Sequence, residues 1–144
     1  MQITSKIPGL SDRSALTIGN FDGLHVGHTG LVNLLVSYAQ VNNLVSVMVT
    51  FNPHPVELLN PGMLIPRITG LSEMQNLLEP QGLDYLVQLP FTHYIAGLSP
   101  EHFFEKIVLD GFSPQMVIVG QDHHFGKDRE GTPEKLRQFG ASHN

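Results

Sequence analysis

The sequence predicts a three-layer α/β fold with a mainly parallel sheet. Short runs rich in β-branched residues alternate with segments of helical periodicity, the pattern of a chain that crosses repeatedly over a sheet. The run over 44–51 is almost entirely apolar, as expected for a strand buried on both faces. With 144 residues and 41% hydrophobic content, the chain is large enough to bury the core of a single domain over 1–144.

The first half of the chain is expected to form a strand, a helix and a second strand. Residues 1–14 are expected to be an irregular or edge-strand lead-in, followed by a strand near 15–19 and a helix over roughly 28–42. The pair Asn42-Asn43 should stop this helix before the strand over 44–51. The core-facing positions of the helix are expected to be Leu31, Leu34, Leu35 and Tyr38.

The next segment is expected to repeat this alternation. A long loop with several prolines, over 52–69, should lead into a helix over 72–79 that ends at Pro80. Ser72 with Gln75 forms a candidate capping box for that helix. A third strand is expected over 83–89.

Two further helices are predicted by a hydroxyl residue that directly precedes a proline. Ser99-Pro100 and Thr132-Pro133 each match an N-cap followed by proline at the first helical position. A fourth strand is expected between them, over 116–120. The helix after Ser99 should bury Phe103, Phe104, Ile107 and Val108.

The composition excludes several classes of protein. The chain has no cysteine, and therefore no disulfide, thiolate metal site or cysteine nucleophile. No signal peptide and no apolar run of membrane-spanning length are visible. A formal net charge of −5 argues against a broad nucleic-acid surface. We therefore expect a cytoplasmic protein that binds small molecules, with no nucleic acid or membrane as partner; the sequence gives no oligomeric state.

The stretch over 16–28 predicts a phosphate-binding turn. It passes from a strand through a glycine-rich turn into a helix, and backbone N–H groups at a helix N-terminus attract anions. Gly19, Gly23 and Gly27 permit close approach of a ligand to the backbone, and His25 and His28 can donate hydrogen bonds to phosphate oxygens.

This turn matches neither of the two best-known phosphate-binding loops. No Gly-Lys-Ser/Thr follows it, and its glycine spacing differs from Gly-x-Gly-x-x-Gly. It resembles the His-x-Gly-His signature of the nucleotidyltransferase superfamily, which implies a Rossmann-like nucleotidyltransferase fold. For the four residues alone, two histidines that merely flank a turn remain an equal alternative.

Two other loops are rich in polar groups, and both follow predicted strands. In the first, prolines flank His54 on both sides, which suits either a binding residue or a histidine that only caps the backbone. The second runs over 120–131, where Lys127 and Arg129 can reach phosphates and Phe125 can pack on a planar ring. Ligands bind at the carboxyl ends of parallel strands, so these loops and the turn over 16–28 are expected to meet.

A protein-held metal ion is not predicted. Zinc needs a fixed tetrahedral set of ligands, and histidines scattered over loops are a weak basis for one. The residues in question are His25, His28, His54, Asp122, His123 and His124.

Six motifs in order resemble the adenylyltransferase module of bacterial FAD synthetases, the bifunctional riboflavin kinase/FMN adenylyltransferases. They are Ile-Gly-Asn-Phe-Asp-Gly-Leu-His-Val-Gly-His (18–28), Thr-Phe-Asn-Pro-His-Pro (50–55), Arg-Ile-Thr (67–69), Leu-Pro-Phe-Thr (89–92), Leu-Ser-Pro-Glu-His-Phe (98–103) and Val-Gly-Gln-Asp-His-His-Phe-Gly (119–126). The match spans about 15–131.

The resemblance implies that FMN and ATP are substrates, with Mg²⁺ bound to ATP, and that FAD and pyrophosphate are products. It implies that His25 and His28 stabilise charge on the phosphates during the reaction. It implies an ATP site of Gly19, Asn20, Phe21, Asp22, Gly23, Gly27 and Asp122. It implies a flavin or nucleotide site of His54, Pro55, Arg67, Thr69, His124, Phe125, Gly126 and Arg129.

The chain also departs from the family. His123 stands where the family's loop usually carries the first aromatic of a Phe-x-Phe motif. The family continues into a Ser/Thr-rich motif ending in arginine and then into a riboflavin kinase domain, so we expect a C-terminally incomplete module without that domain. Two alternatives stay open: a non-catalytic remnant that binds flavin or adenine nucleotide, and transfer of a nucleotidyl group to another phosphorylated acceptor.

Overall fold

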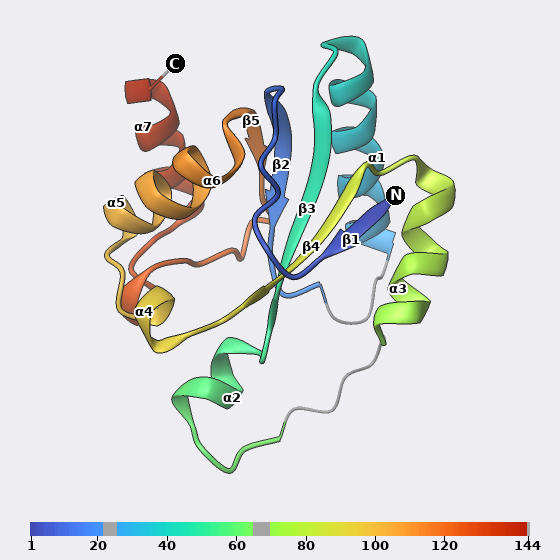
Figure 1. Cartoon of the computed structure of the whole chain (residues 1–144). Helices are drawn as coiled ribbons and strands as arrows, with labels where there is room; N and C mark the ends of the chain where they lie inside the picture. Colours follow the sequence, from blue (N-terminus) through green and yellow to red (C-terminus); the bar gives the residue numbers. More distant parts are fainter. Residues whose placement is uncertain (22–25, 65–69, 144) are drawn as a thin grey trace.

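The chain forms a five-stranded sheet with helices on both faces. A computed structural model describes residues 1–21, 26–64 and 70–143. All strand pairings are parallel, in the order β1-β4-β3-β2-β5. The strands are β1 (Gln2–Thr4), β2 (Ser14–Ile18), β3 (Val45–Asn52), β4 (Tyr85–Pro90) and β5 (Pro114–Ile118). The predicted α/β fold with a parallel sheet is therefore confirmed (Figure 1).

From β2 onward, helices connect successive strands, as parallel pairing requires. The longer ones are α1 (Val26–Val41), α3 (Leu71–Leu78) and α7 (Pro133–His143). Shorter elements are α2 (Pro55–Leu59), η1 (Glu79–Gln81), α4 (His93–Ala96) and η3 (Lys127–Arg129). One continuous helical segment is made by α5 (Pro100–Phe103), η2 (Phe104–Leu109) and α6 (Asp110–Phe112). In the described part of the chain, no helix is long and apolar enough to cross a membrane.

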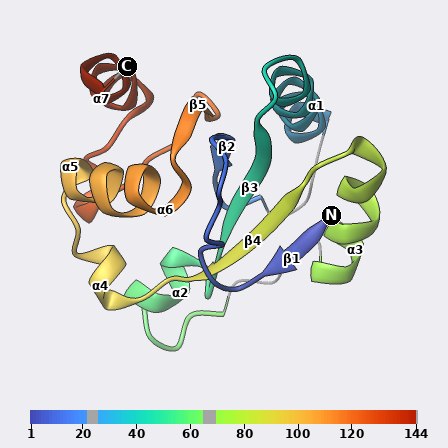
Figure 2. The same cartoon turned by 45° about the horizontal axis from the view of Figure 1, so that its top comes forward.

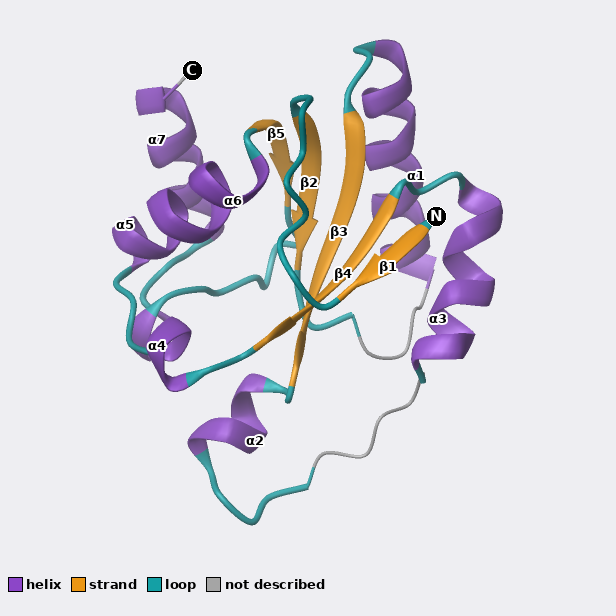
Figure 3. Cartoon of the chain, viewed as in Figure 1, coloured by secondary structure: helices purple, strands orange, loops and turns teal. Residues whose placement is uncertain are grey.

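The sheet separates two apolar clusters, because successive side chains of a strand point to opposite faces. On one face, Ala15 and Met48 pack with residues of α1 and α3, among them Leu35 and Met74. On the other face, strand residues pack against the α5–α6 segment. Figures 2 and 3 show the helices on both sides of the strands, with α1 and α3 on one side and the α5–α6 segment on the other. This confirms the three-layer arrangement.

The predicted caps are formed at the two helices that follow a hydroxyl and a proline. Ser99 Oγ accepts a hydrogen bond from the His102 amide at 3.2 Å, and Thr132 Oγ1 accepts one from Lys135 at 3.2 Å. The capping box predicted for α3 was wrong: the N-cap of this helix is Gly70, without a side-chain hydrogen bond, and Ser72 lies inside the helix.

Other expectations need smaller corrections. Leu34 is 57% exposed, whereas α1 buries Leu35, as expected, together with Val32, Val36 and Ala39. The expected lead-in over 1–14 contains the edge strand β1, in which Gln2 pairs with Tyr85 of β4. The loop over 52–69 includes the helix α2. The fourth predicted strand, β5, begins two residues earlier than expected.

Candidate functional site

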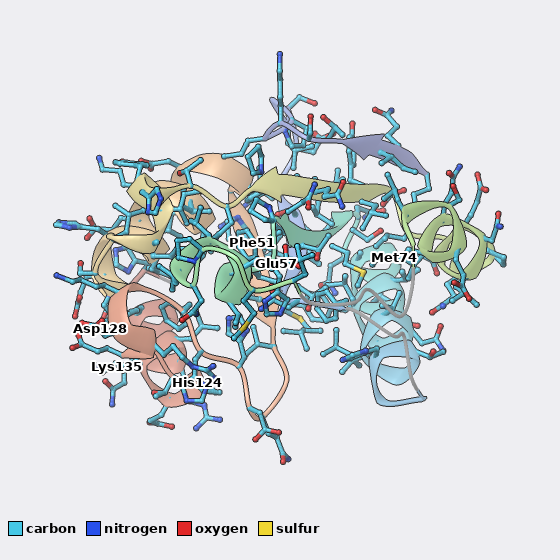
Figure 4. All side chains as sticks on the ribbon, turned by 90° about the horizontal axis from the view of Figure 1, so that it is seen from below. Phe51, Glu57, Met74, His124, Asp128 and Lys135 are labelled. Atoms are coloured by element: carbon cyan, nitrogen blue, oxygen red, sulfur yellow. The ribbon has the colours of Figure 1, made fainter. Side chains whose placement is uncertain are left out.

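A cavity of about 740 Å³ lies at the carboxyl ends of the strands. Its walls come from the residues just after β2, the end of β3 with the segment around α2, the loop and helix after β4, the end of α5, and the loop after β5. Figure 4 views this end of the sheet, with α2 in front of the strands and with His124 and Asp128 to one side of it. The cavity therefore lies where the parallel sheet predicted that the polar loops would meet.

The cavity brings together many of the residues predicted for the site. These are Gly19, Asn20, His54, Pro55, Asp122, His124, Phe125, Gly126 and Arg129. Phe21 and His28 are described but do not line the cavity. Gly27 lies in the first turn of α1. The predicted residues Asp22, Gly23, His25, Arg67 and Thr69 lie outside the described residues.

One wall of the cavity is aromatic and apolar, and sequence reasoning missed most of it. Phe51 and Phe91 contribute rings that contact each other with centroids 5.4 Å apart. Other members of this wall are Val56, Leu59, Ile95 and Phe103. The strand and helix patterns had suggested only core packing for such residues. His93, which has no motif around it, also lines the cavity.

The loop after β5 also lines the cavity, and backbone hydrogen bonds hold it in place. The Lys127 amide donates to the Leu98 carbonyl at 2.6 Å, and Phe125 and Gly131 pair as an antiparallel bridge. Gly126 has φ +77°, and a Cβ there would lie 2.8 Å from the backbone nitrogen of Pro100. Only glycine fits this position without a shift of the backbone.

Two successive residues of this loop have an unusual backbone conformation. Asp128 and Arg129 both have φ of +56°, in the left-handed region that non-glycine residues rarely adopt. Such strain persists only where the surrounding structure enforces it. Both residues line the cavity, so this strained backbone is part of the cavity wall.

His123 and Phe125 form a stacked pair inside the cavity wall. Their ring centroids are 5.8 Å apart with the planes inclined by 21°, and Phe125 also contacts Phe103 with a centroid distance of 5.6 Å. Burial, with a smaller contribution from the neighbouring His124, lowers the pKa of His123 to about 4. His123 is therefore a neutral ring at neutral pH.

His124 lies between a carbonyl and a cation. Its Nδ1 is 2.9 Å from the Asp122 carbonyl oxygen and 3.4 Å from Arg129 Nη2. A single imidazole nitrogen cannot donate to the carbonyl and accept from the guanidinium at once. The shorter distance favours Nδ1–H donation to Asp122, which leaves the guanidinium of Arg129 weakly held.

His54 caps the helix that follows it. Its Nδ1 accepts a hydrogen bond from the Val56 amide at 3.1 Å, so in the neutral ring Nε2 carries the hydrogen. His54 is half-buried and also lines the cavity. The capping role is thus present, and it leaves a hydrogen-bond donor on a ring at the cavity wall.

The turn after β2 is anchored to the sheet on one side and to α1 on the other. The Gly19 amide donates to the Val49 carbonyl at 3.0 Å. Phe21 is 6% exposed, and its ring meets that of His28 edge to face, with centroids 5.3 Å apart. The two residues come from either side of the segment that joins β2 to α1.

The charges at the cavity suit an anion with a planar ring better than a bare cation. Lys127 and Arg129 stand against two carboxylates, Asp122 and Asp128, and four histidines add donors. Among residues 1–21, 26–64 and 70–143, no group of three or more metal-ligating side chains could hold an ion.

Comparisons with known proteins agree with the motifs. A family model described as FAD synthetase matches residues 8–144. The bifunctional riboflavin kinase/FMN adenylyltransferase of Escherichia coli (strain K12) is 33% identical over 128 residues, which are 89% of this chain and 41% of that protein. The protein of the same name from Buchnera aphidicola subsp. Schizaphis graminum is 30% identical over 135 residues, 94% of this chain and 43% of that protein.

Two further relatives extend this result. The FAD synthetase of Listeria monocytogenes is 32% identical over 138 residues, 92% of this chain and 54% of that protein. A crystal structure titled as a macrolide-efflux protein from Streptococcus pneumoniae has a TM-score of 0.83 and 27% identity, and the match covers 96% of this chain and 46% of that one.

The chain spans about half the length of the relatives it matches, or somewhat less. The part that it does span contains the parallel sheet and the cavity at its carboxyl end. The family model covers all but the first seven of its residues, and five of the six motifs contribute residues to the lining of that cavity. The chain belongs to the FAD synthetase family.

Proposed function

We propose that this chain transfers an adenylyl group from ATP to FMN and forms FAD and pyrophosphate. In this reaction an oxygen of the FMN phosphate attacks the α-phosphorus of ATP. The bond between that phosphorus and the bridging oxygen breaks, and pyrophosphate leaves with the electron pair. No covalent intermediate with the protein is needed, so the protein contributes alignment and stabilisation of charge.

The observation that carries the proposal is the cavity at the carboxyl ends of the strands, lined by aromatic rings and by cations, in a member of this family. Its aromatic wall, with Phe91 and Phe103, suits the planar ring system of a flavin. The loop after β5 offers Lys127 and Arg129 to phosphate oxygens. Gly19 lies at the same cavity and leads towards the N-terminus of α1, where phosphates are favoured.

The roles of the site residues follow the motifs. His25 and His28 are proposed to stabilise the charge that develops on the phosphates. The ATP side is proposed to consist of Gly19, Asn20, Phe21, Asp22, Gly23, Gly27 and Asp122. The flavin side is proposed to consist of His54, Pro55, Arg67, Thr69, His124, Phe125, Gly126 and Arg129.

Mg²⁺ is proposed to enter with ATP. Protein sites for this ion commonly supply one or two carboxylates and leave the remaining positions to water and substrate phosphates. Asp122, an exposed carboxylate at the cavity, fits that requirement. The bound ion would neutralise charge on the leaving pyrophosphate, while Asp122 would hold it at the ATP side.

The test is FAD formation from FMN and Mg-ATP, followed by chromatography, together with titrations of FMN and ATP binding. We expect turnover that falls at least a hundredfold in His28→Ala. The matched control is His102→Ala, which removes an exposed histidine that does not line the cavity. Binding of both nucleotides without turnover would instead establish the non-catalytic alternative, and absence of both binding and turnover would refute the proposal.

A further inference from the structure

The ring of Phe21 occupies space that a side chain at Gly19 would need. A Cβ built on Gly19 would lie 2.9 Å from Phe21 Cζ and 3.1 Å and 3.3 Å from the two Cε atoms. The φ of Gly19 is not in the left-handed region, so the requirement here is for space and not for an unusual backbone. The far edge of the Phe21 ring therefore lies directly over the end of β2.

The rest of Phe21 is enclosed by the core. The residue is 6% exposed and belongs to the apolar cluster between the sheet and α1, with Ala15 and Val32. It does not line the cavity. The side chain of Phe21 is thus packed in the core and lies outside the cavity wall.

The same ring contacts the imidazole of His28. The two ring planes meet at 88° with centroids 5.3 Å apart, the edge-to-face arrangement that aromatic pairs prefer. Nδ1 of His28 is buried. His28 belongs to the first turn of α1. Its imidazole contacts the Phe21 ring, which in turn packs against Gly19 at the end of β2.

We propose that Phe21 is a positioning residue for His28, and that Gly19 is required because it leaves room for the Phe21 ring. Gly19, at the end of β2, contacts the Phe21 ring, and this ring contacts His28. Through these two contacts the sheet restricts the orientation of the imidazole. The role in turnover rests on the proposed function, whereas the orientation of His28 does not.

The kinetic test is a double-mutant cycle with FMN and Mg-ATP. Phe21→Leu keeps an apolar side chain and removes the ring, and we expect it to lower kcat about three- to tenfold with little change in KM for FMN. In a His28→Ala background the same substitution should lower kcat by less than twofold, because Phe21 acts through the imidazole. Equal losses in both backgrounds would overturn the proposal.

Gly19→Ala approaches the same ring from the other side. Its Cβ would push the Phe21 ring away from the strand. We therefore expect Gly19→Ala to lower kcat when His28 is present and to lower it much less in the His28→Ala background, as for Phe21→Leu. The matched control is Gly30→Ala in α1, where a Cβ meets no atom within 4 Å. We expect Gly30→Ala to keep the kcat of the unmodified protein.

A spectroscopic readout separates this proposal from the proposed function. In histidine-labelled protein, the His28 imidazole resonances can be assigned by their loss in His28→Ala. A ring held edge to face by Phe21 experiences a ring-current shift, and we expect that shift to collapse in Phe21→Leu and to change in Gly19→Ala. If the protein makes no FAD, the proposed function fails. The His28 resonances still show whether Phe21 orients the imidazole. Unchanged His28 resonances in both folded variants would refute the positioning role.

Discussion

The imidazole of His123 lies flat against the ring of Phe125, with 5.8 Å between ring centroids. The stacked pair forms part of the cavity wall, where burial lowers the pKa of His123 to about 4 from the usual 6.5. Below pH 6.5 the unfolded chain binds a proton at this residue that the folded chain does not take up. The folded state therefore loses stability relative to the unfolded state as the pH falls from 6.5 to 4.

We expect His123→Phe to flatten this part of the stability profile. The largest difference that the shift allows is about 3 kcal/mol near pH 4, and partial exposure of the ring makes the real difference smaller. Urea unfolding from pH 8 to pH 4 measures it. At pH 8 the histidine is neutral in both states, so any difference there reports packing alone. Parallel profiles for the two proteins would contradict the assignment.

Variants of His54 test whether this N-cap residue also binds a nucleotide. Asparagine is a good N-cap, so His54→Asn should keep the hydrogen bond to the Val56 amide that His54→Ala removes. We expect fast amide exchange at Val56 only in His54→Ala, but about tenfold weaker FMN or ATP binding in both variants, because both lack the Nε2–H donor. Normal binding in His54→Asn would mean that the histidine is only a cap.

Gly126 carries two requirements at once, a φ of +77° and the close approach of Pro100. We expect Gly126→Ala to reduce the free energy of unfolding by about 1–3 kcal/mol and to weaken FMN binding, because the loop carries Phe125 and Lys127. Gly120→Ala is the matched control, since a Cβ at Gly120 meets no atom within 4 Å. Equal stability of the two variants in urea would show that the loop accommodates a Cβ at Gly126 without loss of unfolding free energy.

Ser46 and Asp84 join β3 to the start of β4 at the end of the sheet opposite the cavity. Asp84 Oδ2 accepts hydrogen bonds from the Ser46 amide at 2.9 Å and its hydroxyl at 2.8 Å. We expect Ser46→Ala to cost about 1–2 kcal/mol of unfolding free energy with unchanged nucleotide affinity. The exposed Ser142→Ala should change neither quantity. A loss of affinity in Ser46→Ala would mean that the two ends of the sheet are coupled.

The fold was predictable because its strong signals are local. The apolar run of β3 and the Ser99 and Thr132 caps each depend on a few consecutive residues. The buried face of α1 was assigned wrongly at Leu34 because apolar residues occur on several sides of this helix, so its periodicity did not decide which stripe faces the sheet. The three-residue strand β1 is too short to carry a pattern of its own.

The site was predictable in its loops and not in its aromatic wall. His54 and the loop over 120–131 follow strands, and the parallel topology brings them together. Phe51, Phe91 and Phe103 look like ordinary core residues in the sequence, and only the packing of α2 and α4 near the strand ends makes them line a cavity. Phe21 lies within a motif predicted to bind ATP, and nothing in that motif indicated that its side chain is buried in the core.

The strand order also constrains how this chain is made on the ribosome. β1 must wait for β4, because Gln2 pairs with Tyr85, and β2 gains its second neighbour only when β5 is synthesised. At about 5–20 residues per second, the nascent N-terminus waits several seconds before its partner strand exists. Parallel pairings of this kind close large loops and form slowly. During synthesis, β1 and β2 therefore have unpaired edges until β4 and β5 are made, and folding of this sheet requires that these edges do not pair with other nascent chains in that interval.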